Sequence, residues 1–197
     1  MSPEAASTTA LSRGASSQDL ARLVEQAQQG KREAVEELYL LHFDRIYSYL
    51  HMNVGNRHDA EDLTTQVFVK MLESIGKFRW RSAPFSAWLF RIAHNLAMDH
   101  FRASKRWQPE EEVPEPEPDE STSAEAGALE AIGRKSMLEL IEDLSPEQQQ
   151  VLTLKFVFNF ANAEAATILG KTEGAIKSLQ HRALVSLQKQ VGQPDAG

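Results

Sequence analysis

Residues 78–102 place aromatic rings and arginines close together in a chain that is acidic overall, with a formal net charge of −7. On a helix of this sequence Arg91, Asn95, Arg102 and Arg106 fall on one strip, with Asp99 at its edge. A solvated helix face would normally mix charges of both signs, whereas arginine and amide side chains hold phosphates and read base edges. The strip therefore indicates contact with nucleic acid.

Four residues just before this helix, Arg79, Trp80, Arg81 and Ser82, lie in a segment with no periodicity that would bury them. Cations beside an aromatic ring suit single-stranded nucleic acid, because an unstacked base can lie on the ring while the cations hold the backbone. An extruded base also exposes its pairing edge to a small pocket, at an unstacking cost of about a few kcal/mol. We expect this segment to contact an opened strand.

The rings inside the helix have a simpler interpretation than the cations. They belong to an apolar stripe that would face a helical core: Phe85, Trp88, Leu89, Ile92 and Leu96. A second apolar strip consists of Phe90, Ala97 and Phe101. Such a strip is a packing surface when it is buried in a bundle and a partner surface when it is exposed.

A second constellation occupies residues 162–188, where two apolar-periodic helices flank a turn at residues 170–172. This is the pattern of a helix-turn-helix, in which Thr172 would cap the second helix. The inward positions would be Ile176, Ala183 and Leu187. The positions expected to face a major groove are Glu173, Gly174, Lys177, Ser178, His181 and Arg182. Taken alone, His181 could equally be an ordinary exposed histidine.

Charge is segregated along the chain. Residues 108–130 hold nine acidic residues and no lysine or arginine, whereas residues 77–107 hold seven basic residues and the single acid Asp99. The overall negative charge argues against nucleic acid as a partner. The basic segment, however, provides a local surface that could bind phosphates. The acidic, proline-rich segment is typical of an extended, self-repelling spacer.

Composition excludes several classes of protein. The chain has no cysteine, so disulfides and thiolate metal sites are excluded. The longest apolar runs are far shorter than the roughly 20 residues of a membrane helix, and residues 1–17 lack the features of a signal peptide. We therefore expect a cytoplasmic protein with no membrane insertion, no metal or other cofactor and no enzymatic activity.

The periodicity outside the tails and the acidic segment is helical, which predicts an all-α protein. Residues 18–53 predict a short and a longer helix broken near Gly30, after which Gly55 ends the longer helix and Asp59 caps the next. The buried stripe of that next helix would be Leu63, Val67, Phe68, Met71 and Leu72. A further helix, with Pro84 in its first turn, would run to about Trp107.

The second unit has a clear helix start in "LSPEQQQVL", where Ser145 would be the cap, Pro146 the first helical residue and Gln148 the partner in a capping box. We therefore predict two helical domains joined by a flexible acidic linker. The expected segments are a disordered extension (1–17), a first domain (18–107), the linker (108–128), a second domain (129–191) and a tail (192–197).

Three stretches together resemble the extracytoplasmic-function group of bacterial RNA polymerase sigma factors: "DAEDLTTQVFVKM", "KFRWRSAPFSAWLFRIAHNLAMDHFR" and the run from "LIEDLSPEQQQ" to "HRALVSLQ". The resemblance covers nearly all of residues 18–190. It implies a two-domain, all-helical initiation factor. Region two would dock on the polymerase clamp and melt the minus-ten element, and region four would contact the polymerase flap and read the minus-thirty-five element as duplex.

The resemblance also assigns roles to residues of this sequence. The polymerase-docking positions would be Asp59, Glu61, Asp62, Gln66 and Phe68. Asn95, with Arg91, Asp99 and Arg102 on its strip, matches the segment near the melted strand, and residues 79–82 match the segment that captures a flipped base. The acidic linker could thread polymerase channels, and an anti-sigma factor is an expected partner. Without the resemblance, Asp59 and Asp62 could simply favour a helix start.

The chain departs from the family pattern at Ala165, Leu179 and Gln180, which weakens the binding of DNA phosphates expected of region four.

Three other functions are compatible with parts of the sequence. A helix-turn-helix repressor or activator explains residues 160–190 but leaves the first domain without a role. A metal-dependent hydrolase would need His94, Asp99 and His100, which spread widely around one helix. An interaction scaffold built on the acidic segment is a further alternative.

Overall fold

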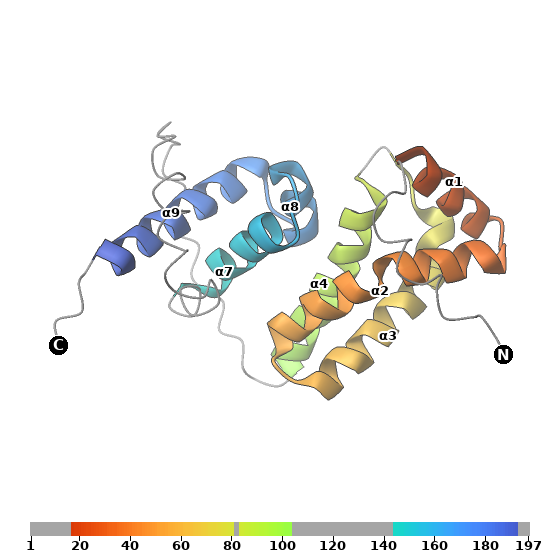
Figure 1. Cartoon of the computed structure of the whole chain (residues 1–197), viewed down its shortest axis with the longest axis horizontal. Coiled ribbons are helices and arrows are strands. Elements are labelled where there is room, and N and C mark those ends of the chain that lie inside the picture. Colours follow the sequence, from red (N-terminus) through yellow and green to blue (C-terminus); the bar gives the residue numbers. More distant parts are fainter. Residues whose placement is uncertain (1–16, 81–82, 104–143, 193–197) are drawn as a thin grey trace, which may run out of the picture. The chain divides into compact units, whose positions relative to one another are not determined.

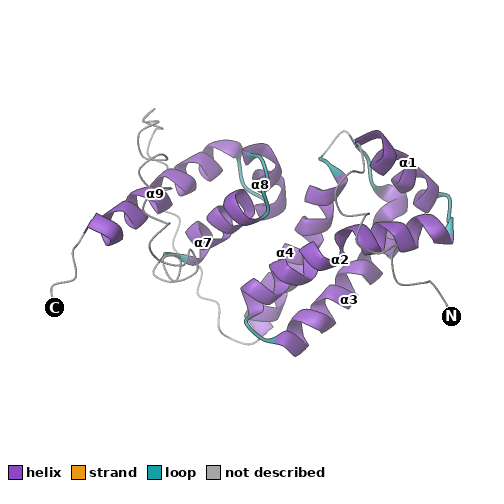
Figure 2. Ribbon diagram, viewed as in Figure 1, coloured by secondary structure: helices purple, strands orange, loops and turns teal. Residues whose placement is uncertain are grey.

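The computed structural model describes residues 17–80, 83–103 and 144–192 (Figure 1). Every regular element in these ranges is a helix, as Figure 2 shows. The chain divides into two compact units, residues 1–108 and 109–197. The expectations for the N-terminal extension, for Arg81, Ser82 and Arg106 and for the acidic linker fall outside the described residues.

The described residues of the first unit form a bundle of four helices: α1 (Ser17–Gln28), α2 (Arg32–Val54), α3 (Arg57–Ser74) and α4 (Phe85–Ala103). A 3₁₀ turn, Ile75–Lys77, follows α3. Helix α2 packs against α1, α3 and α4, and α3 packs against α4. The buried stripe predicted for α4 is confirmed at Phe85, Leu89 and Leu96, whereas Trp88 and Ile92 are only half-buried.

The second apolar strip of α4 is a packing surface rather than a partner surface. Phe90 and Ala97 have no exposed area, and Phe101 is half-buried. The ring of Phe90 lies 5.2 Å from the ring of Tyr49 on α2, measured between centroids. The α2–α4 contact therefore uses this strip.

Two predictions for α3 were wrong in detail. Its cap is Asn56, whose side chain accepts hydrogen bonds from the backbone N–H groups of His58 and Asp59, at 2.8 and 3.4 Å. Asp59 lies inside the first turn instead. Leu72 is 50% exposed, so it lies outside the buried stripe. Gly55 ends α2 as predicted, in the left-handed conformation with φ of 68°.

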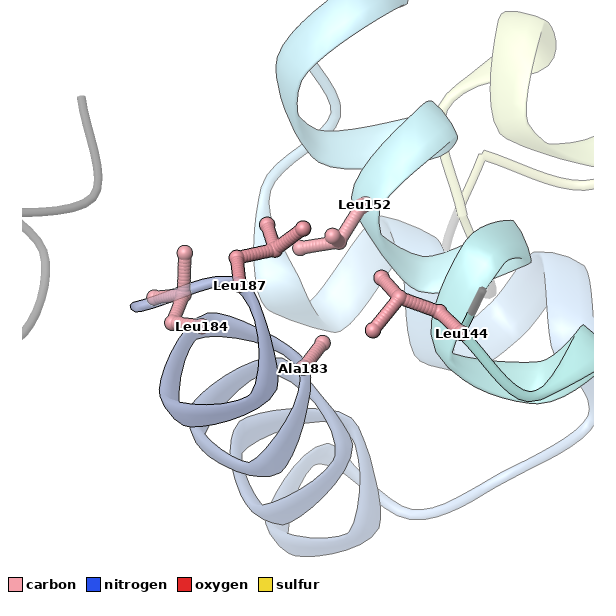
Figure 3. Close-up of a cluster of buried hydrophobic side chains, with 5 residues drawn as sticks. All are labelled: Leu144, Leu152, Ala183, Leu184 and Leu187. Carbon is pink, nitrogen blue, oxygen red and sulfur yellow. The ribbon is translucent and has the colours of Figure 1, made fainter. Parts of the chain in front are cut away.

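The second unit contains α7 (Pro146–Leu152), a π-helical turn (Thr153–Val157), α8 (Asn162–Leu169) and α9 (Glu173–Gly192). The capping box at Ser145 and Gln148 is confirmed. Gly170 ends α8 with φ of 67°, so the helix-turn-helix forms as predicted. Figure 3 shows part of the core between the α7 region and α9, made of Leu144, Leu152, Ala183, Leu184 and Leu187.

Candidate nucleic-acid interface

The polar strip predicted on α4 lies on the surface of the first unit. Arg91, Asn95, Asp99 and Arg102 are all exposed. The guanidinium of Arg102 contacts the carboxylate of Asp99 at 3.2 Å, and both side chains are about two-thirds exposed, at 67% and 70%. An exposed pair of this kind is worth at most about 1 kcal/mol, so Arg102 can exchange Asp99 for a phosphate.

Beside this strip a groove with a volume of about 390 Å³ separates α3 from α4. Helix α4 contributes Ile92, Asn95, Leu96 and Asp99 to its lining, and α3 contributes Lys70, Glu73 and Ser74. Ile92 and Ser74 are half-buried and Leu96 is buried, whereas the other polar side chains are exposed. The groove therefore combines an apolar floor with a polar rim that includes Asn95.

Lys70 and Glu73 were not expected as site residues. In the sequence they are ordinary charged positions of a surface helix, more than 20 residues before Asn95. Only the packing of α3 against α4 brings them to the same groove. No local pattern could have identified them.

The segment before α4 is anchored at one end and exposed at the other. Phe78 is buried, and its ring lies between those of Trp80 and Phe85, with centroids 5.2 and 5.4 Å away. Trp80 keeps 39% of its surface exposed, as a stacking role requires. Arg79 donates hydrogen bonds to the carbonyl groups of Gly76 and Phe78, at 3.0 and 2.8 Å, and stays exposed.

A residue of α1 holds this segment in place. The amide nitrogen of Gln28 donates to the carbonyl oxygens of Ile75 and Phe78, at 2.9 and 3.1 Å. These bonds join positions about 50 residues apart in the chain, and nothing in the sequence indicated them. Gln28 therefore fixes the start of the segment that carries Arg79 and Trp80.

The acidic side chains predicted to dock on polymerase form the outer face of α3. Glu61, Asp62 and Gln66 are exposed. Asp59 is half-buried, and its carboxylate lies 3.5 Å from the ring nitrogen Nε2 of His100 on α4. Phe68 does not join this face, because it is only 6% exposed.

Phe68 packs inside the bundle instead. Its ring centroid lies 4.6 Å from that of Tyr39 and 6.4 Å from that of Phe43, both on α2. The sequence also placed Phe68 in the buried stripe of α3, and the structure agrees with that interpretation. A direct docking contact through the Phe68 ring would require the bundle to open, so we do not retain it.

Two buried histidines lie between α2 and the rest of the bundle. Burial lowers the pKa of His42, although its hydrogen bond with the Leu38 carbonyl opposes this effect and Arg45 adds to it. The hydroxyl of Tyr49 lies 3.1 Å from Nδ1 of His94, and burial raises the pKa of Tyr49 well above its usual value. His42 and Tyr49 therefore favour their uncharged forms, and all three side chains support packing.

The residues named for a metal-dependent hydrolase have separate partners. His94 contacts Tyr49, Asp99 pairs with Arg102, and His100 faces Asp59. Across the described ranges, no three His, Asp or Glu side chains form a group that could hold a metal ion. No helix in the same ranges is both long and apolar enough to cross a membrane.

The recognition surface of the second unit lies on α9. The hydroxyl of Thr172 accepts a hydrogen bond from the backbone N–H of Ala175 at 3.1 Å, which confirms the predicted cap. The exposed positions at the start of the helix are Thr172, Glu173, Gly174, Lys177 and His181. Lys177 also contacts Glu173 at 3.4 Å. Ser178 and Arg182 are half-buried.

The turn before α9 is tied to α7 by an ion pair. The ammonium of Lys171 lies 2.8 Å from the carboxylate of Glu147, and both side chains are about one-third exposed, at 31% and 32%. The two family departures on α9, Leu179 and Gln180, are buried at 4% and 8% exposure. They contribute to packing rather than to the exposed face.

Two family models match this arrangement. The model for sigma-70 region 2 matches residues 38–107, and the model for sigma-70 region 4 matches residues 134–187. The first range contains the α4 strip, the groove and the acidic face of α3, and the second contains the helix-turn-helix. The fold and these surfaces define a two-domain transcription initiation factor.

Curated relatives narrow the class. The ECF RNA polymerase sigma factor BldN of Streptomyces coelicolor is 39% identical over 182 residues, which cover 90% of this chain and 69% of that protein. SigD of Mycobacterium tuberculosis is 31% identical over 179 residues, which cover 86% of this chain and 82% of that protein. The chain belongs to the ECF sigma factors of RNA polymerase, which direct core polymerase to promoters.

Solved structures share the fold. CnrH, in complex with the cytosolic domain of CnrY, matches with a TM-score of 0.62 and 23% identity, over 86% of this chain and 94% of that one. RpoE of Bartonella quintana, in complex with the anti-sigma factor NepR, matches with a TM-score of 0.57 and 22% identity. The match covers 80% of this chain and 98% of that one.

Proposed function

We propose that this sigma factor holds the opened minus-ten strand with α4, the adjoining groove and the segment before α4. The observation that carries this proposal is the exposed strip of Arg91, Asn95 and Arg102 beside a groove with an apolar floor. Arginines hold phosphates, and the free amide of Asn95 can pair with a base edge. Arg79, Trp80, Arg81 and Ser82, in the segment before α4, would also contact the opened strand.

In the second unit, α9 is proposed to enter the major groove of the minus-thirty-five element. Its capped N-terminal end exposes Lys177 and His181, with Glu173 and Gly174 beside them. In helix-turn-helix proteins the N-terminal part of the second helix contacts base edges, and Lys177 and His181 are exposed in this part of α9. Arg182 and Ser178 would contact the backbone from the flank.

Docking on polymerase is proposed to use the outer face of α3, where Asp59, Glu61, Asp62 and Gln66 reach the surface. This acidic face would meet basic groups of the clamp, and the second unit would contact the flap. The protein would act by binding alone, in the cytoplasm where polymerase lies, without catalysis or a cofactor of its own.

An anti-sigma factor is proposed to compete for the first unit. Large apolar side chains are exposed on two helices of the first unit: Tyr39 and Leu40 on α2, at 39% and 62%, and Leu72 on α3, at 50%. Exposed apolar side chains of this size suit a protein partner. The Bartonella quintana protein with the same fold was solved with its anti-sigma factor NepR.

The test is transcription from a genomic fragment library by core polymerase, with and without the full chain, followed by mapping of the start sites. We expect start sites that depend on the chain and share minus-ten and minus-thirty-five elements. Permanganate reactivity should show opened thymines at the minus-ten element only with both proteins present. Specific duplex binding by the chain alone, with no effect on start sites, would instead indicate a repressor or activator.

A further inference from the structure

The ion pair between Lys171 and Glu147 joins two elements of the second unit that are separate in the chain. The two residues lie 24 positions apart, and the ammonium of Lys171 lies 2.8 Å from the carboxylate oxygen Oε1 of Glu147. Glu147 belongs to the first turn of α7, whereas Lys171 lies in the turn between α8 and α9. The pair therefore links α7 to the turn from which the proposed recognition helix begins.

The backbone at each end of this pair is held by local hydrogen bonds. The capping box of Ser145 and Gln148 sets the first turn of α7. Gly170 ends α8, and the backbone N–H of Lys171 donates to the carbonyl oxygen of Ala166 at 3.0 Å. Because both ends are held, breaking the pair would release the start of α9 from α7 and would not merely free a side chain.

The apolar core and the ion pair act on different parts of α9. The cluster shown in Figure 3 contacts the second half of this helix, at Ala183, Leu184 and Leu187. The side chains proposed to reach the major groove, Lys177 and His181, lie closer to its start. Apolar burial is non-directional, whereas a charge-assisted hydrogen bond fixes both distance and direction. The pair is thus suited to orient the end of α9 that would enter the groove.

An alternative role for Lys171 would be to hold a DNA phosphate, as a lysine beside a recognition helix can do. In that case Glu147 would compete for the lysine and repel the DNA, so removal of Glu147 would strengthen binding. If the pair orients α9, removal of each partner would weaken binding. The direct contact between the two charges, each on a side chain only about one-third exposed, at 31% and 32%, favours orientation.

We propose that Glu147 and Lys171 act together as positioning residues, which hold the start of α9 in the orientation that reads the minus-thirty-five duplex. By contrast, the contact between Lys177 and Glu173 lies within α9 and cannot orient that helix against another element. This inference rests on the proposed function of α9.

The test uses holoenzyme reconstituted from core polymerase and the full chain. Its affinity is measured by fluorescence anisotropy for two promoter fragments, one with the mapped minus-thirty-five element intact and one with that element replaced. The ratio of the two affinities gives the preference for the element. Glu147→Gln and Lys171→Gln should each reduce this preference about fivefold. The double variant should reduce it no further, because both changes remove the same interaction.

Three further variants serve as controls. Lys171→Arg keeps the charge and the pairing, and should retain the preference within about twofold. Glu25→Gln on α1 and Lys189→Gln at the far end of α9 each remove one exposed charge, and should leave the preference nearly unchanged. All variants should keep the helical signal in circular dichroism and should bind the minus-ten single strand as the unmodified holoenzyme does.

The outcomes separate this inference from the proposed function. If the unmodified holoenzyme prefers the intact element but Glu147→Gln maintains or strengthens that preference, the pair does not position α9. Loss of helical signal in a Gln variant would also overturn the inference, because the pair would then support folding and not orientation. If the unmodified holoenzyme shows no preference for the intact element, the proposed function of α9 fails and the inference fails with it.

Discussion

The two units of this sigma factor present their proposed DNA contacts in different ways. In the second unit, the contacts lie on one helix and its preceding turn, from Thr172 to Arg182. In the first unit, Asn95 of α4 shares a groove with Lys70 and Glu73 of α3. A duplex offers its major groove to a single inserted helix, whereas an unpaired base needs walls on more than one side. If each unit binds its proposed target, the shape of that target accounts for a surface on one helix in the second unit and a surface shared by two helices in the first.

The largest expected effect comes from removing a core ring of the assembled unit. Phe85 is fully buried, and its ring contacts those of His42, Phe78 and Trp88. Phe85→Ala should lower the free energy of unfolding by about 3–5 kcal/mol. Urea unfolding followed by tryptophan fluorescence measures this in the first unit alone, because all three tryptophans precede residue 108.

The control for this prediction is Leu152→Ala in the core of the second unit (Figure 3). It should leave the tryptophan transition unchanged while lowering the stability of the remaining helical signal by about 2–5 kcal/mol. If Leu152→Ala shifts the tryptophan transition as much as Phe85→Ala does, the two cores are not independent.

Asn95→Ala should weaken promoter opening roughly ten- to hundredfold and relax the base preference at the minus-ten element, because it removes a base-edge contact. Arg102→Ala is the comparison. It should weaken all promoters alike and reduce the slope of log affinity against log salt by about one. Open-complex formation on a set of minus-ten variants measures both effects. An equal loss on every variant with Asn95→Ala would contradict a base-reading role.

Lys177→Ala tests the local surface of the second unit. It should reduce transcription about tenfold from promoters with an intact minus-thirty-five element, and have little effect on binding of the minus-ten single strand. Lys189→Ala removes the same charge from the far end of α9, where the side chain is also exposed, and should have a much smaller effect. Equal effects of the two substitutions would show that α9 acts through its net charge, and not by inserting its N-terminal end into the major groove.

The smallest expected effect is a pH dependence confined to the first unit. Burial lowers the pKa of His42, so the unfolded chain takes up this proton more readily than the folded protein. The stability due to the neutral ring is therefore complete above the unfolded pKa of about 6.5 and decreases as the pH falls below it. Between pH 7.5 and 5.5 the loss should reach up to about 1.4 kcal/mol.

His42→Gln should remove most of this dependence, as measured by urea unfolding with tryptophan fluorescence at the two pH values. The exposed histidine variant His58→Gln serves as the control and should retain the dependence of the unmodified protein. If His42→Gln leaves the pH dependence unchanged, the ring does not titrate as its burial implies.

Sequence by itself determined the helical class, most helix ends and the exposed positions Glu173, Gly174, Lys177 and His181 of α9. These features depend on local physics: apolar spacing, the left-handed glycines Gly55 and Gly170, and the caps Ser145 and Thr172. When one face of a helix is exposed, the spacing of the apolar residues along that helix predicts which face it is. The residues proposed for the minus-thirty-five contact could therefore be selected before any packing was known.

Tertiary structure alone decided which side chains of α3 are available and what they meet. Phe68 and Leu72 occupy the same apolar stripe, yet one is buried beneath Tyr39 and the other is half exposed. Lys70 and Glu73 become groove residues only because α4 packs beside them. Exposure and contact between helices depend on where neighbouring helices end, and local periodicity carries no information about that boundary.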